Sequence, residues 1–253
     1  MKVTFLGTGT SQGVPIIGCT CAVCQSTNRK DKRLRCSILI EVDNVSIVVD
    51  TGPDFRQQML TSNNNKLDAV LFTHSHMDHT AGLDDVRAYN FIHQKPMEVF
   101  ADDLTIATLK NQYAYIFAKK KYPGIPQINL NTITNQPFSV KDIGVIPIEV
   151  MHHKLPVKGF RINDFTYITD ANYISPQEKE KIKGSKILVL NALRQTEHIS
   201  HFTLQQAIEL SQEFKVEKTY LTHISHQMGL HNEVTAELPN NIHLAYDQLT
   251  INC

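Results

Sequence analysis

The stretch His74-Ser75-His76-Met77-Asp78-His79 carries the strongest signal in this chain. It follows the compact apolar segment Ala69 to Thr73, which has the length of a buried strand. Imidazole is a preferred ligand of zinc and related metals, and an added carboxylate can serve a neighbouring ion. In a tight turn, His74 and His76 can converge on one ion while Asp78 and His79 face a second. The motif therefore predicts a two-metal site, with a cluster of surface histidines as the alternative.

Two coordination shells need more ligands than this motif supplies, so others are expected at further strand ends. Three residues downstream each lie at the end of a predicted strand: His152 after Val145–Met151, Asp170 after Phe165–Thr169, and His223 one residue beyond Thr219–Leu221. One such residue alone would be weak support, because a His or Asp at a strand end is often structural. As a set they fit a site on the rim of a sheet. A carboxylate such as Asp170 can bridge two ions at the ~3.5–4 Å separation of two-metal hydrolases.

Strands and helices alternate along the whole chain, which predicts an α/β protein with mixed sheets. Further strands are expected at Lys2–Leu6, at Phe160–Ile162 and Lys186–Leu190, and in two hairpins, Ser37–Val42 with Ser46–Asp50 and Ile242–Ala245 with Leu249–Ile251. Helices are expected at Asp54–Leu60, Asp102–Lys121 and Thr203–Phe214. No break in composition marks a boundary, so we expect one domain over 1–253. Within it, 102–137 is interpreted as a helical insertion that ends in a loop from Pro123 to Asn135.

A second group of metal ligands is expected near the N-terminus. Cys19, Cys21 and Cys24 supply three thiolates, one ligand short of a closed tetrahedral zinc site. His226 is a candidate for the fourth, because it lies three residues beyond His223. Reactive or merely buried cysteines are the alternative. The basic stretch from Arg29 to Arg35 could attract phosphate, although a solvated loop is the favoured interpretation.

Composition limits the partners that the chain can have. Lys+Arg and Asp+Glu number 25 each, so the formal net charge is zero. Proteins that grip nucleic-acid backbones usually show a basic excess, which makes nucleic acid an unexpected partner and leaves a small phosphorylated one open. The N-terminal residues lack the pattern of a signal peptide, and no apolar run approaches the roughly 20 residues of a membrane span. We expect a cytoplasmic protein without a membrane partner, and a homodimer stays open.

These motifs together resemble the metallo-β-lactamase superfamily. The resemblance rests on Phe5 to Gly9, on Asp50-Thr51-Gly52, on the histidine motif and on the three downstream ligands. It implies a four-layer αββα sandwich, two mixed sheets flanked by helices, with the site along one edge. It also implies the ligand sets: His74, His76 and His152 for one ion; Asp78, His79 and His223 for the other; Asp170 between them.

Three further stretches narrow the resemblance to the PhnP group: Gly9 to Pro15, the three cysteines, and Leu221 to Gln227. Members of that group are phosphodiesterases that open phosphoribosyl 1,2-cyclic phosphate. The resemblance implies a structural zinc held by Cys19, Cys21, Cys24 and His226, which would staple the loop 19–36. It also makes His201 the candidate general acid beside the ligand Asp78, with His198 as the alternative. Asn191 to Arg194 replaces a more acidic counterpart, so the substrate stays open.

The expected function is hydrolysis of a small cyclic phosphate diester through a hydroxide that bridges two zinc or manganese ions. A phosphoribosyl 1,2-cyclic phosphate or a nucleotide-like ester would be the substrate. Three other hydrolases share the scaffold: a nuclease that processes tRNA 3′ ends, a thiolester hydrolase and a lactone hydrolase. A non-enzymatic accessory protein of the PqqB type is the alternative from another class, since fold does not fix the reaction.

Overall fold

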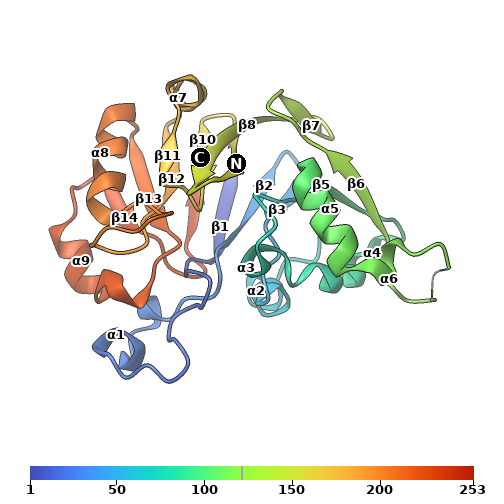
Figure 1. Cartoon of the computed structure of the whole chain (residues 1–253), viewed down its shortest axis with the longest axis horizontal. Helices are drawn as coiled ribbons and strands as arrows, with labels where there is room; N and C mark the ends of the chain where they lie inside the picture. Colours follow the sequence, from blue (N-terminus) through green and yellow to red (C-terminus); the bar gives the residue numbers. More distant parts are fainter. Residues whose placement is uncertain (121) are drawn as a thin grey trace.

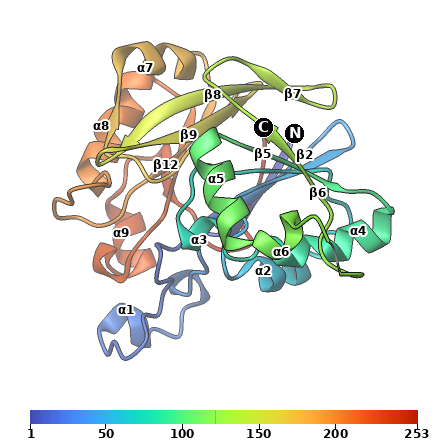
Figure 2. The ribbon, with the colours of Figure 1, turned by 45° about the vertical axis from the view of Figure 1, so that its right-hand side comes forward.

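Two mixed β-sheets lie face to face, and helices cover the outer surface of each (Figures 1 and 2). The computed structural model describes residues 1–120 and 122–253. The first sheet has the order β15 (Thr250–Asn252), β1 (Lys2–Gly7), β2 (Ser37–Val42), β3 (Val45–Val49), β4 (Ala69–Leu71), β5 (Met97–Ala101) and β6 (Ile128–Thr132). The second has the order β11 (Tyr173–Ile174), β8 (Ile143–His152), β9 (Leu155–Ile162), β10 (Phe165–Ile168), β12 (Ile187–Asn191), β13 (Lys218–Thr222) and β14 (Ile242–Leu244), with β7 (Phe138–Val140) pairing with β8.

The helices fall into two sets along the chain, one for each sheet. The set beside the first sheet is α2 (Phe55–Ser62), α3 (Met77–Thr80), α4 (Arg87–His93), α5 (Asp103–Gln112) and α6 (Ala114–Phe117). The set beside the second sheet is α7 (Pro176–Ile182), α8 (Leu204–Phe214) and α9 (His231–Glu237). The short α1 (Ala22–Gln25) projects from the body on a loop of its own (Figure 1). The four layers confirm the predicted αββα sandwich.

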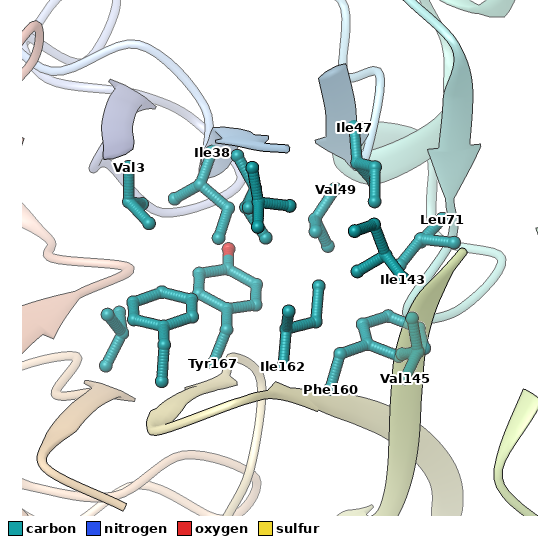
Figure 3. Close-up of a cluster of buried hydrophobic side chains, with 14 of the residues drawn as sticks. Val3, Ile38, Ile47, Val49, Leu71, Ile143, Val145, Phe160, Ile162 and Tyr167 are labelled. Carbon is teal, nitrogen blue, oxygen red and sulfur yellow. The ribbon is translucent and has the colours of Figure 1, made fainter. Parts of the chain in front are cut away.

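Three apolar layers hold this sandwich together. The central layer lies between the sheets, where Val3, Ile38 and Val49 face Phe160 and Ile162 (Figure 3). One outer layer joins the first sheet to α2, α4 and α5, and the other joins the second sheet to α7, α8 and α9. Strand side chains alternate between the two faces of a sheet, and here both faces are covered. This explains why strands buried along their whole length, such as β3 and β12, are nearly continuous apolar runs.

The parallel strands bring their carboxyl ends to one edge of the sandwich. β3 runs parallel to β4, and β10 runs parallel to β12 and β13. Three residues beyond these ends turn the chain with a left-handed backbone: Asp50 has φ 64°, Asp170 has φ 52° and His223 has φ 55°. A non-glycine residue in this conformation costs of order 1 kcal/mol or more and is typical of functional sites. The edge is thus where the fold gathers polar, strained residues.

Three sequence predictions about the elements are wrong. Ile242–Ala245 and Leu249–Ile251 do not form a hairpin, because β14 pairs with β13 in the second sheet and β15 pairs with β1 in the first. The expected loop from Pro123 to Asn135 contains β6, which is paired with β5 along one side. β14 and β15 have three residues each and β6 carries polar residues, so the apolar pattern of all three is weak. The helix expected over 102–121 breaks at Tyr113, and Lys121 lies outside the described residues.

None of the described helices combines the length and apolar character that crossing a membrane requires. The amino group of Met1 donates a hydrogen bond to the Cys253 carbonyl at 3.0 Å, so the two ends of the chain lie side by side.

Gly52 provides a test of how tightly the edge is packed. A Cβ at this position would lie 2.1 Å from the backbone oxygen of Asp78. We expect Gly52→Ala to lower the free energy of unfolding by about 1–3 kcal/mol, measured by urea denaturation with a chelator present. Gly144→Ala is the matched control, because a Cβ there meets nothing within 4 Å. Equal effects of the two substitutions would contradict the packing described here.

Candidate two-metal active site

All seven residues predicted as ligands of the two ions meet at the carboxyl edge of the strands. Ligand atoms that lie within 4.8 Å of one another form two groups: His74, His76, His152 and Asp170; and Asp78, His79, Asp170 and His223. Asp170 belongs to both. The arrangement matches the two expected ligand sets, although the residues come from positions spread over some 150 positions of the chain.

Asp170 lies between the two groups and offers one oxygen to each. Its Oδ1 is 3.1 Å from Nε2 of His223 and 3.4 Å from Nε2 of His79. Its Oδ2 is 3.9 Å from Nε2 of His74. On the side of the second group, Asp78 Oδ2 is 3.1 Å from His79 Nε2. Asp170 is therefore placed as a carboxylate shared by two ions would be.

The buried nitrogens of the site show that the residues fit metal ions. Nε2 of His74, of His79 and of His223 are each buried and without a hydrogen-bond partner in the described part of the chain. Leaving a buried polar atom unpaired costs about 1–3 kcal/mol, so three converging in one place need an explanation. Their convergence on the Asp170 carboxylate provides it, because imidazole and carboxylate together suit divalent transition metals.

A carboxylate behind the site fixes the orientation of His79. Asp50 Oδ2 accepts a hydrogen bond from Nδ1 of His79 at 2.7 Å. The backbone N–H and the hydroxyl of Thr73 both donate to the same carboxylate at 2.8 Å. The contact places the proton on Nδ1 and leaves Nε2 free to face the site. Asp50 ends the predicted strand Ser46–Asp50 and was assigned no role from the sequence, although a carboxylate at a strand end was an available signal.

Charge in the site favours cations. Burial alone would lower the pKa of His79, but the carboxylates of Asp78, Asp170 and Asp50 raise that pKa well above its usual value. Burial dominates at His74, whose pKa falls well below its usual value. The site therefore encloses three carboxylates, more negative charge than one protonated histidine offsets. Divalent cations would offset the remainder.

His201 and His198 extend the row of imidazoles beyond the ligands. The ring centroid of His201 lies 4.6 Å from that of His152 and 4.8 Å from that of His223. Burial and the neighbouring His223 lower the pKa of His201 to about 3. His198 follows at 5.1 Å from His201 and is half-buried. Both candidates for the general acid therefore lie at the site, and His201 is the nearer to the ligands.

The three N-terminal cysteines surround His226. Nδ1 of His226 lies 3.3 Å from Sγ of Cys19, 3.3 Å from Sγ of Cys21 and 3.6 Å from Sγ of Cys24. The backbone N–H of Cys24 and the His226 ring lower the pKa of Cys21 to about 6, which favours its thiolate. Three sulfurs and one nitrogen are the donor set of a closed zinc site. The geometry thus brings together the four residues predicted for a structural zinc.

Three other histidines and the basic stretch from Arg29 to Arg35 lie outside the site or have another role. His93, His231 and His243 belong to neither ligand group. The favoured interpretation of Arg29 to Arg35 as a solvated loop is wrong for Arg33, which is 5% exposed. Its guanidinium donates to the Thr8 hydroxyl at 2.8 Å and to the Ala245 carbonyl at 2.6 Å. These acceptors, with Nδ1 of His231 at 3.2 Å from Nη2, offset part of the cost of burying the guanidinium.

Comparison with known proteins agrees with this geometry. The family model described as "Beta-lactamase superfamily domain" matches residues 46–224, which include the histidine motif and all three downstream ligands. This chain belongs to the beta-lactamase superfamily. An octanoyltransferase of Porphyromonas gingivalis is 40% identical over 252 residues, which make up 98% of this chain and 51% of that protein. The chain therefore spans about half the length of this curated relative.

Three solved structures of similar fold were compared with this chain. A diphosphatase from the PhnP family has a TM-score of 0.93 and 36% identity, with 100% of this chain and 97% of that chain covered. Zn(2+)-bound PqqB from Methylobacterium extorquens has a TM-score of 0.81 and 18% identity, with 100% of both chains covered. The short form of human tRNase Z has a TM-score of 0.69 and 18% identity, with 100% and 99% covered. The last two likenesses show the fold alone, and the first supports the resemblance to the PhnP group.

Metal analysis distinguishes the cysteine site from the histidine site. We expect Cys21→Ser to lose one tightly held zinc that His76→Ala retains, because the two residues belong to separate ligand groups. Zinc and manganese would be counted per chain by mass spectrometry after extensive dialysis. The same zinc content in both variants would refute the cysteine site.

Proposed function

We propose that this chain is a metal-dependent phosphodiesterase acting on a small phosphoric ester, with a cyclic phosphate such as phosphoribosyl 1,2-cyclic phosphate as the leading substrate. The observation that supports this proposal most directly is the position of Asp170 between two groups of imidazole and carboxylate side chains. The 36% identity to a PhnP-family diphosphatase supports phosphoric-ester chemistry over other reactions of the fold.

In this proposal the two ligand groups hold one divalent ion each. His74, His76 and His152 would hold one, Asp78, His79 and His223 the other, and Asp170 would contact both. When bound, such a pair lowers the pKa of water and offsets the charge that develops on a phosphoryl group. The chain itself does the positioning: Asp50 and Thr73 orient His79, and the Ser200 carbonyl accepts a hydrogen bond from Nδ1 of His152 at 2.9 Å. Such partners behind the ligands raise metal affinity.

His201 is the residue proposed to hold the proton for the leaving oxygen. It is buried beside His152 and His223 and comes from the loop before α8. A phosphate anion next to the ring would favour its protonated form, against the effect of burial. An alkoxide leaves poorly without a proton, so this role is needed for a phosphodiester.

Hydrolysis of an acyl thiolester is the second candidate, for one specific reason. The relative that matches 98% of this chain is described as an octanoyltransferase, which handles an acyl group. Half of that protein lies outside the match, so its description does not say which half carries the octanoyltransferase activity. A two-metal hydrolase can polarise a thiolester carbonyl as well as a phosphoryl oxygen.

Assays with purified protein and added manganese or zinc decide between these candidates. We expect turnover of bis(p-nitrophenyl) phosphate and of 2′,3′-cyclic nucleotides, and a rate loss of about 100-fold or more in His76→Ala, since a lost ligand removes an ion. His93→Ala is the matched control, because His93 belongs to neither ligand group. Turnover of octanoyl-coenzyme A without turnover of any phosphodiester would overturn the proposal in favour of the thiolester.

A further inference from the structure

A basic cavity lies at the amino ends of the parallel strands of the first sheet. Asp68 directly precedes β4, Lys95 comes two residues before β5, and Lys141 lies in the turn between β7 and β8. Together with Lys66 they line a cavity of about 570 Å³. Because His74 follows the carboxyl end of β4, the length of this strand separates the cavity from the candidate active site.

Three lysine ammoniums share one carboxylate in this cavity. Nζ of Lys141 donates to Oδ1 of Asp68 at 2.6 Å. Nζ of Lys95 lies 3.5 Å from the same oxygen, and Nζ of Lys66 lies 3.6 Å from Oδ2. Burial alone would raise the pKa of Asp68, but Lys141 and the Ser46 N–H lower it, so the carboxylate is ionised at neutral pH. The cluster therefore carries two positive charges in excess.

Stabilisation of the fold does not account for two of these lysines. Lys141 alone neutralises the carboxylate, which is 3% exposed. The side chains of Lys66 and Lys95 are 44% and 47% exposed, and ion pairs of such exposure contribute about 0–1 kcal/mol. Ammoniums gathered around one carboxylate also repel one another. Among the described residues, neither Lys66 nor Lys95 pairs with a carboxylate other than Asp68, so both can contact an anion from solution.

A second cavity adjoins the first. It measures about 450 Å³ and shares Asn65 and Lys66 with the basic cavity. At this boundary Lys66 also donates to the Asn44 carbonyl. The walls of the second cavity are mostly polar and include Ser62 and Asn63. Side-chain amides and hydroxyls can bond the hydroxyl groups of a small organic molecule.

We propose that the cavity of Lys66, Lys95 and Lys141 binds the phosphate monoester group of a small hydroxylated molecule, whose hydroxyl groups lie in the adjoining polar cavity. The charges match, since a phosphate monoester is close to a dianion at neutral pH. Lysine binds phosphate as a point charge on a flexible stem, so three lysines can adapt to its oxygens. The site lies apart from the two ligand groups, and it does not depend on the proposed phosphodiesterase activity.

Pyridoxal 5′-phosphate is the probe for this site, because it is a phosphate monoester that also carries an aldehyde. The aldehyde condenses with a neutral lysine amine and releases water, and borohydride then reduces the imine to a stable secondary amine. Labelled lysines would be identified by peptide mass spectrometry of the metal-loaded chain. We expect Lys66 or Lys95 to be labelled about tenfold faster than Lys2 and Lys186, the effect of one further charged contact to the phosphate.

Lys2 and Lys186 are the matched references. Their side chains are 51% and 60% exposed, and each pairs with one carboxylate, at 2.7 Å and 2.8 Å. They are thus at least as accessible as the lysines of the cavity. Labelling of the cavity lysines no faster than that of Lys2 and Lys186 would overturn the site.

Competition and substitution locate the phosphate. Inorganic phosphate and glycerol 3-phosphate should both suppress labelling of the cavity lysines, glycerol 3-phosphate at the lower concentration. In Lys95→Gln the labelling of Lys66 should fall about tenfold, whereas Lys186→Gln should leave it unchanged. Labelling that neither phosphate suppresses would also overturn the site. Suppression at equal concentrations would overturn the hydroxylated ligand class in favour of free phosphate.

Discussion

The structure depends on a buried carboxylate held where two sets of imidazoles meet. Asp170 is 2% exposed, and its backbone is in the left-handed region. Ala171, the residue after Asp170, is held in place by the side-chain amide of Asn191. This amide accepts a hydrogen bond from the Ala171 N–H at 2.9 Å and donates one to the Ala171 carbonyl at 3.0 Å. The Thr169 hydroxyl donates to Asp170 Oδ1 at 2.7 Å. An isolated buried charge is costly, so cations on either side would stabilise this arrangement.

The sandwich provides the edge at which this carboxylate and the imidazoles meet. Each sheet is apolar on both faces, which leaves its carboxyl edge as the place where polar residues can gather. Strand ends from the two sheets meet there, and the ligands come from both: His74 from the first, Asp170 and His223 from the second. A single sheet could not surround two ions in this way. The same scaffold serves several reactions, so what separates them lies in the loops beside the edge.

Much of the fold, and the convergence of all seven predicted ligand residues, could be predicted from the sequence for a physical reason. Ligands are recognised by residue type and by their position after apolar strands, and His152, Asp170 and His223 carry both signals. Asp50 was missed as an orienting group, since its partner His79 is distant in sequence. The pairing of β14 and β15 was missed because short strands do not reveal their neighbours. Arg33 was misjudged because its acceptors, Thr8 and Ala245, come from opposite ends of the chain.

Anomalous diffraction from crystals grown with manganese or zinc tests the central claim most directly. The account predicts two peaks about 3.5–4 Å apart on either side of the Asp170 carboxylate. One peak would contain His74, His76 and His152 in its coordination shell, and the other Asp78, His79 and His223. A single peak, or two peaks that Asp170 does not contact, would contradict the account.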